Sequence, residues 1–296
     1  MTNMKKSIFN ASFEESLNLE DDGFRKLQQE QHDKLARKVI NGKPTFSFKM
    51  QAFILTLLFP VCFNYLLSVA STELTNNQSN GLHLNPSNYN FLTWQVYLVL
   101  LCIWLLFVIV GKYFSQVFIL PYRYQFHNFT YMVILYIELD LLILGLLLSN
   151  LPFWIVLVIM IIWIILIYFM VSVELRGARK IIYSETNELR KIDKIAKLIS
   201  MYGMGLLGVA VIIKQLISMF SGKNSNFLEN IGILLALLIM NIIMPAVVIF
   251  IGTPYFLQAY YKLKYPEEYR EWEGKSLEEW YGKKYLKKHK ELLEHE

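Results

Sequence analysis

Long apolar runs separated by polar segments dominate the pattern along this chain. Six windows of 19 to 22 residues are almost free of charged side chains; they cover residues 52–70, 92–110, 131–149, 152–172, 201–220 and 231–252. A helix needs roughly 20 apolar residues to cross a bilayer, because the hydrocarbon core offers no water to free backbone groups. The pattern therefore predicts an all-α polytopic integral membrane protein with six transmembrane helices.

Basic residues alternate along the chain in step with these windows. Of the 29 Lys and Arg, 27 lie in four segments, namely 1–51, 111–130, 173–200 and 253–296. Cytoplasmic segments of membrane proteins carry an excess of Lys and Arg. We therefore expect a cytoplasmic N-terminal arm over 1–51, a transmembrane domain over 52–252 with a cytoplasmic connector at 173–200, and a cytoplasmic tail over 253–296. Five or seven spans would place one basic terminus outside.

Composition narrows the class of protein further. With 55% hydrophobic and only 18% charged residues, the chain is too apolar to fold around one soluble core. Its net charge of +5 suits contact with anionic lipid headgroups at the cytoplasmic face better than contact with a nucleic acid. About fifty mixed polar residues precede the first window, so no cleavable signal peptide is expected. The abundance of Ile, Lys, Asn, Tyr and Phe favours a bacterial source, and hence a multi-pass protein of the cytoplasmic cell membrane.

Short sequence signals predict helices outside the spans. Ser12 and Glu15 have the spacing of a capping box, and Ser276 and Glu279 repeat it in the tail. In the connector, apolar residues recur at helical spacing from Leu189 to Ile199, which predicts an amphipathic helix within 174–200. An amphipathic tail helix would place aromatic rings beside ammonium groups and so suit the membrane surface or a partner protein; its contact residues would be Trp280, Tyr281, Lys283, Lys284, Tyr285, Lys287 and Lys288. The alternative is a helix that packs on the cytoplasmic loops.

Charged side chains inside the windows are the main candidates for function, because such groups are costly at membrane depth. Glu138 and Asp140 lie in the middle of the third window, and their spacing directs them to nearly opposite sides of a helix. They are therefore not expected to share one site as a carboxylate pair. Lys214 lies in the fifth window, where it either pairs with Asp140 or extends its stem to the interface.

Two prolines fall inside windows and predict kinked helices. Pro60 leaves the carbonyl of Thr56 without its helical donor, and Pro245 does the same for Asn241. Thr56, Pro60 and Asn64 share one helix face. Five polar residues are candidates for a substrate or ion site, although a structural role is favoured for them: Asn64, Glu138, Asp140, Lys214 and Asn241. The structural role is hydrogen bonding between packed helices.

Motifs for catalysis or cofactor binding are missing from the sequence. The G-x-G-x-x-G match at Gly203–Gly208 lies inside an apolar window, where glycines allow close helix approach. The chain has neither a Walker A sequence nor H-E-x-x-H nor G-x-S-x-G. We expect no catalytic residue, no metal site and no cofactor.

Three functions remain open. The first is a non-catalytic accessory or protective protein, which supports a peptide or protein exporter or gives immunity against a membrane-active toxin or bacteriocin. The second is a secondary transporter or permease subunit that uses Asp140 or Glu138 near the helix broken at Pro245. The third is an enzyme acting on lipid, whose headgroup site would be formed by Tyr122, Arg123, His127, Glu174, Arg176 and Arg179. The first is preferred because the sequence contains no catalytic signature, and a transporter subunit or other membrane protein is its expected partner.

Overall fold

Five helices long and apolar enough to cross a membrane form the body of the molecule. The computed structural model describes residues 6–20, 39–40, 43–76, 88–183 and 241–293. The five candidate spans are Phe46–Thr75, Trp94–Gly111, Val117–Ser149, Phe153–Tyr183 and Asn241–Lys264. Their outward faces are apolar: Phe153 is 70% exposed and Ile164 64% exposed. Such faces are matched by lipid rather than by water, so the protein is helical and membrane-embedded.

The first span is a helix of three parts. It begins as α3 (Phe46–Thr56), continues as the π-helical segment η1 (Leu57–Phe63) and ends as α4 (Asn64–Asn76). The Thr45 hydroxyl caps its N-terminus by accepting from the Phe48 amide. A small antiparallel pair precedes it, in which strand β1 (Val39–Ile40) pairs with strand β2 (Lys43–Pro44).

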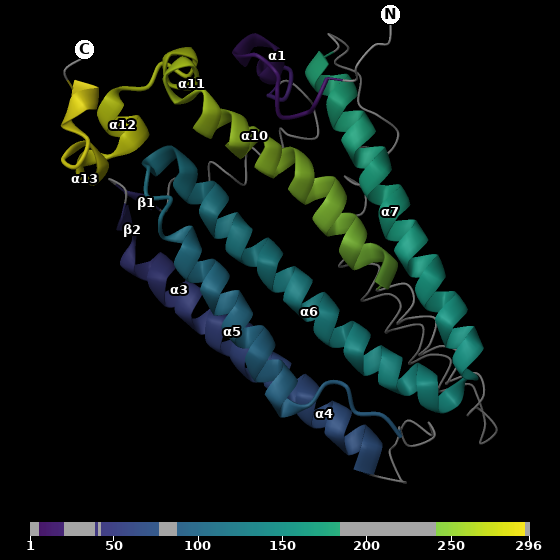
Figure 1. The fold of residues 1–296 in the computed structure, drawn as a ribbon. Helices are drawn as coiled ribbons and strands as arrows, with labels where there is room; N and C mark the ends of the chain where they lie inside the picture. The colour runs from purple at the N-terminus through teal and green to yellow at the C-terminus, as the bar shows by residue number, and fades with distance from the viewer. Residues whose placement is uncertain (1–5, 21–38, 41–42, 77–87, 184–240, 294–296) are drawn as a thin grey trace, which may run out of the picture.

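The remaining long helices are α5 (Trp94–Gly111), α6 (Leu120–Asn150) with the preceding 3-10 turn η2 (Val117–Ile119), α7 (Phe153–Tyr183), and α10 (Thr253–Lys264) with the preceding π-helical segment η3 (Val248–Gly252). Helices α5, α6 and α7 alternate in direction across the bundle, whereas the last span runs in the same direction as α7, so that both end at the N-terminal arm (Figure 1). Helices α5 and α6 pack together along Leu100, Trp104 and Ile134. A second apolar cluster joins α6 to α7 through Ile143, Leu147, Val156 and Trp163.

Four of the described spans extend beyond their apolar windows, the first of them over Phe46–Thr75. Helix α6 begins at Leu120 inside the expected loop 111–130, α7 runs on to Tyr183, and α10 carries the last span to Lys264. Charged residues end an apolar window without ending a helix, because Lys, Arg and Glu are good helix formers. The expected span 201–220, the connector residues 184–200 and the first part of the window 231–252 lie outside the described residues.

The N-terminal arm packs on the end of the last span. Its short helix α1 (Phe13–Leu17) has the expected capping box between Ser12 and Glu15. Hydroxyl groups of the last helices hold the arm: Tyr261 accepts from the Ala11 amide at 3.2 Å and donates to the Ile8 carbonyl. Ser16 Oγ lies 2.8 Å from the hydroxyl of Tyr269, on helix α11 (Pro266–Trp272).

Buried polar groups strengthen this junction. The ammonium of Lys262 is 2.7 Å from Glu273 Oε1 and 3.6 Å from Glu20 Oε1, so it joins the last span to both the tail and the arm. Burial raises the pKa of the Tyr269 phenol to about 12, although its hydrogen bond with Ser16 acts in the opposite direction. The phenol therefore stays neutral and keeps its hydrogen bond throughout the neutral pH range.

The tail contains two short helices where one was expected. The capping box at Ser276 begins α12 (Leu277–Tyr281), as predicted, but Gly282 has φ +86° and separates it from α13 (Lys283–Leu286). A residue at positive φ cannot continue a helix.

The tail aromatic rings contact protein. Trp280 is 3% exposed and stacks on Phe118 with 4.5 Å between ring centroids, and Tyr281 is 5% exposed. Tyr281 also donates to Glu267 at 2.6 Å. For these two rings the structure favours packing on the loops over the membrane surface.

The other tail residues of the expected surface are less buried. Tyr285 is half-buried between Tyr281 and His289. Lys283 pairs with Glu278 at 3.0 Å and is exposed. The remaining expected contact residues, Lys284, Lys287 and Lys288, are also exposed. Contact with lipid or a partner stays a prediction for these lysines.

Replacing Gly282 by Ala should loosen the tail by about 1–3 kcal/mol, the usual cost of a strained backbone conformation. An added Cβ would also lie 2.6 Å from Val117 Cγ2. Gly274→Ala is the matched control: its φ of +64° also strains an alanine, but nothing lies within 4 Å of the added Cβ, so the greater effect expected at Gly282 measures the contact with Val117. Limited proteolysis of residues 283–293 in the purified protein measures the effect. Equal cleavage of the two variants would contradict this account, and Val117→Ala should partly rescue Gly282→Ala.

Candidate functional site

The first span departs from α-helical geometry at Pro60. Proline has no amide hydrogen and its ring crowds the preceding turn, so the helix widens into the π segment η1 around this residue. One main-chain oxygen of this segment has a partner on the next span: the hydroxyl of Tyr97 on α5 donates to the Val61 carbonyl at 3.1 Å. The irregular segment is thereby fixed against α5, and it ends directly before Asn64.

A buried polar cluster surrounds Glu138 of α6. The Glu138 side chain is completely buried, and neither of its carboxyl oxygens has a hydrogen-bond partner among the described residues. Its neighbours are Asn64 of α4, Tyr97 and Tyr131, each close enough to interact electrostatically with the carboxyl. Asn64 Oδ1 accepts from the Tyr131 hydroxyl at 2.9 Å, so these two neighbours of Glu138 are also joined to each other. Three spans therefore enclose one carboxyl group.

A stripe of hydroxyl groups continues from this cluster along α4. Ser68 and Ser71 are buried, with exposed fractions of 1% and 6%. The Ser71 hydroxyl donates to Asn90 Oδ1 at 2.9 Å, and Asn90 Nδ2 donates to the Thr72 hydroxyl at 3.1 Å. Because α4 runs away from the packed termini, the stripe leads from Asn64 toward the opposite end of the bundle (Figure 1).

These hydroxyl residues were missed by reasoning from the sequence. The signal was present, since Ser68 follows Thr56, Pro60 and Asn64 on the same helix face at intervals of four residues. Serine and threonine are ordinary residues in a membrane helix, however, because their hydroxyls can return to the helix backbone. Ser68 does so by donating to the Tyr65 carbonyl at 2.7 Å. Only their burial and the contact with Asn90 distinguish these hydroxyl residues from ordinary serines and threonines of a membrane helix.

Asp140 lies against a different helix. Tyr136, one turn earlier on α6, and Asn241 of the last span are its polar neighbours. Asp140 Oδ1 and both side-chain polar atoms of Asn241 have no hydrogen-bond partner among the described residues. The expected core therefore divides into two places, with Asn64 beside Glu138 and Asn241 beside Asp140. Lys214, the expected partner of Asp140, lies outside the described residues.

The second proline is also followed by irregular helix. Pro245 is in helical backbone, and the π segment η3 begins three residues later at Val248. Gly252 ends this segment, and a Cβ there would lie 3.0 Å from the Phe129 ring of α6. The last span therefore comes close to α6 at Gly252, the residue immediately before α10.

The residues expected to form a lipid headgroup site are distributed over two helices. On α6, Tyr122 packs on Tyr255, and the Arg123 guanidinium donates to the Phe114 carbonyl at 3.1 Å. His127 lies beside Gly111 of α5. On α7, Glu174 is buried and Arg176 Nε donates to the Ser172 carbonyl of its own helix. Among the described residues, no three His, Cys, Asp or Glu side chains gather for a metal ion.

The arrangement can bind a small cation or a proton at Glu138. An unpartnered carboxyl at membrane depth is stable when it carries a proton or neutralises a bound cation. The neighbouring side chains of Tyr131, Tyr97 and Asn64 are neutral. None of them therefore takes the place of a bound proton or cation at the carboxylate. Neither known protein-family models nor curated proteins nor solved structures give a match to this chain.

Replacing Tyr131 by Phe should lower the free energy of unfolding by about 0.5–1.5 kcal/mol, because one buried hydrogen bond is lost. Asn64→Ala should cost more, since it leaves the Tyr131 hydroxyl unpaired in hydrocarbon. Denaturation of the purified protein in mixed micelles measures both, and the double variant gives the coupling between the side chains. Tyr168→Phe is the control, because Tyr168 is 74% exposed. Additive losses in the double variant would rule out this hydrogen bond.

Proposed function

We propose that this protein is a secondary transporter or permease subunit in which Glu138 binds the proton or cation that is transported or coupled. The observation that carries the proposal is the complete burial of Glu138 with both carboxyl oxygens unpartnered among the described residues. Ionisable groups inside membranes usually mark ion pathways and proton relays.

The surroundings of Glu138 support the same function. Transporters commonly bind their coupling ions where a membrane helix is interrupted, since irregular backbone there lines the site. The π segment η1 ends at Asn64, one of the neighbours of Glu138. The buried hydroxyls of Ser68 and Ser71 extend from there along α4, and hydroxyl groups can relay protons or coordinate a cation. Asp140 is a second candidate for the same role on the other face of α6.

Glu138→Gln should abolish proton-coupled transport while leaving the protein folded, because the amide keeps the size of the side chain but cannot release a proton. The purified protein is reconstituted into liposomes that contain a pH-sensitive dye, and a proton gradient is applied across their membrane. Metal cations, amino acids and short peptides are then added one at a time. At least one solute should change the rate of proton movement, and Glu138→Gln should remove that change.

Two further variants make this experiment specific. Glu174→Gln is the matched control, because Glu174 is as deeply buried as Glu138 but is not without a partner. Asp140→Asn tests the second carboxyl in the same assay. Unchanged coupling in both Glu138→Gln and Asp140→Asn would sink the proposal, as would a wild-type protein that moves no protons with any solute.

We also propose the six-span topology with both termini in the cytoplasm. Its support is the contact between the two ends of the chain, since Ile8, Ala11 and Ser16 hydrogen-bond to Tyr261 and Tyr269. Ends on one side of a membrane need an even number of crossings, and five candidate spans are described. The sixth is the window 201–220, which is outside the described residues. The basic arm and tail favour the cytoplasmic side for both ends.

Reporter fusions test this topology directly. A fusion after Asn77 or Ser225 should be active only as an external reporter, and a fusion after the last residue only as a cytoplasmic one. The distribution of Lys and Arg is the physical reason, because basic loops are retained on the cytoplasmic side. Opposite locations for the two ends would contradict an even number of spans, and intracellular behaviour at Asn77 would reverse the orientation.

The accessory or protective function preferred from the sequence stays a prediction. Deleting the gene distinguishes it from transport: sensitivity to a co-produced peptide toxin indicates immunity, loss of a secreted product indicates export support, and loss of solute uptake indicates transport. In a transporter, Glu138→Gln should reproduce the deletion phenotype. In an accessory protein without ion coupling, the same variant should complement fully.

A further inference from the structure

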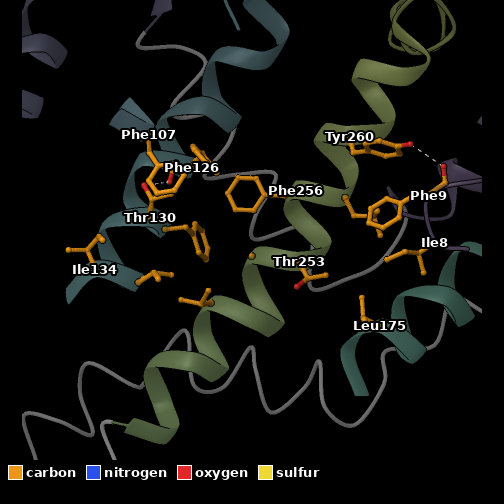
Figure 2. Close-up of a pocket in the computed structure, with 15 residues that line it drawn as sticks. Ile8, Phe9, Phe107, Phe126, Thr130, Ile134, Leu175, Thr253, Phe256 and Tyr260 are labelled. Carbon is orange, nitrogen blue, oxygen red and sulfur yellow. Dashed lines mark hydrogen bonds between the residues drawn. The ribbon is translucent and has the colours of Figure 1, made fainter. Parts of the chain in front are cut away.

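A cavity of about 490 Å³ lies along α10, between this helix, α6, α7 and the N-terminal arm (Figure 2). Phe126 and Ile134 line it from α6, Phe256 from α10, and Leu175 from α7. Phe9 of the arm forms the wall nearest the packed termini. Its volume lies within the usual range of about 300–1,000 Å³ for sites that hold a small ligand.

The lining of this cavity is suited to hydrocarbon. Most of the lining residues are aliphatic or aromatic, and of the three hydroxyls among them, those of Thr130 and Tyr260 donate to main-chain carbonyls, whereas that of Thr253 has no such acceptor among the described residues. Thr130 Oγ1 donates to the Phe126 carbonyl at 2.9 Å, and the Tyr260 hydroxyl donates to the Phe9 carbonyl at 3.2 Å. A polar ligand would therefore lose its hydrogen bonds to water and gain few in return.

The walls of the cavity reach the surface that faces lipid. Val133 on α6 is 39% exposed and Leu175 on α7 is 37% exposed, and both helices are candidate spans. Hydrocarbon chains of the bilayer therefore border the cavity directly. An acyl chain that enters from this side exchanges lipid contacts for protein contacts and leaves no polar group unsatisfied.

Cations lie at the end of the cavity nearest the packed termini. Arg179 is one helical turn beyond Leu175, and Lys264 Nζ donates to the carbonyl of Phe9 at 2.9 Å. Both interact electrostatically with Tyr183, which places them in one neighbourhood. Neither has a carboxylate within 4.0 Å in the described parts of the chain. The Lys264 ammonium also contacts the Ala11 carbonyl and the rings of Tyr261 and Tyr265, but these neutral groups do not cancel its charge, so both cations can attract a phosphate.

We propose that this cavity is a binding site for one anionic phospholipid, with an acyl chain between α6 and α10 and the phosphate at Arg179 and Lys264. Hydrocarbon lining, access from the bilayer and unpaired cations at one end together specify such a molecule. The arm takes part through Phe9, so bound lipid would also stabilise the packing of the arm on α10. This site shares no residue with the cluster at Glu138 and does not depend on the proposed transport.

Native mass spectrometry of the purified full chain tests the site with phosphatidylglycerol and phosphatidylcholine of identical chains. The wild type should retain one phosphatidylglycerol in preference to phosphatidylcholine. Val133→Trp fills the cavity and should abolish retention of this lipid, whereas the matched Ile137→Trp, one turn away and outside the lining, should not. Leu175→Trp fills the cavity from the opposite wall and serves if Val133→Trp fails to fold.

Charge variants test the headgroup part of the site. Arg179→Gln and Lys264→Gln should each weaken phosphatidylglycerol retention roughly fivefold, and phosphatidylcholine retention should not change. Arg176→Gln is the control on the same helix, because Arg176 is exposed and its guanidinium bonds its own helix backbone. Equal lipid retention by the Val133 and Ile137 variants would overturn the cavity site. An unchanged preference for phosphatidylglycerol in both charge variants would overturn the assignment of an anionic lipid.

Discussion

The absence of water between membrane helices is the constraint on which this structure depends. Each polar group there must find a partner within the protein, carry a proton, or remain unsatisfied at a large cost. Pro60 causes a π segment, and the Val61 carbonyl in this segment accepts a hydrogen bond from the Tyr97 hydroxyl. Asn64 Oδ1 accepts a hydrogen bond from the Tyr131 hydroxyl. Glu138, Asp140 and Asn241 are exceptions among the described spans, and of the two carboxyls only Glu138 has both oxygens without a hydrogen-bond partner there. The contrast makes Glu138, rather than the whole polar core, the centre of the candidate site.

The two carboxyls lie on opposite faces of α6, so each has neighbours on different helices. Glu138 faces α4 and α5, where three spans enclose it, while Asp140 faces Asn241 on the last span. A change of protonation at Glu138 would affect the packing of α6 on α4 and α5. A change at Asp140 would affect the packing of α6 on the last span. In the proposed transporter, α6 would therefore connect the first spans with the last one as a rigid element, since it is one continuous helix of 31 residues.

Tyrosine hydroxyls organise the end of the bundle at which the termini meet. Tyr261 and Tyr269 hold the arm, and Trp280 places the tail on the turn before α6. Tyrosine suits this depth because its ring packs against apolar side chains while its hydroxyl bonds a carbonyl. The same junction brings Phe9 to the cavity along α10 and Lys264 to its edge. Packing of the arm and formation of the proposed lipid site are thus consequences of one set of contacts.

The positions of the helices and the faces of their side chains could be predicted from the sequence. The residues that each side chain contacts in the folded protein could not. Apolar windows predicted the described spans, Ser12 and Ser276 predicted helix starts, and the spacing of Glu138 and Asp140 predicted opposite faces, because each depends only on residues a few positions apart. Hydropathy misjudged where α6, α7 and α10 begin or end, since charged residues continue a helix beyond the hydrocarbon. Which helix each carboxyl meets, the burial of Ser68 and Ser71, and the stacking of Trp280 on Phe118 were decided by tertiary structure. These contacts join residues far apart in the chain, and no local period encodes the neighbour that packing supplies.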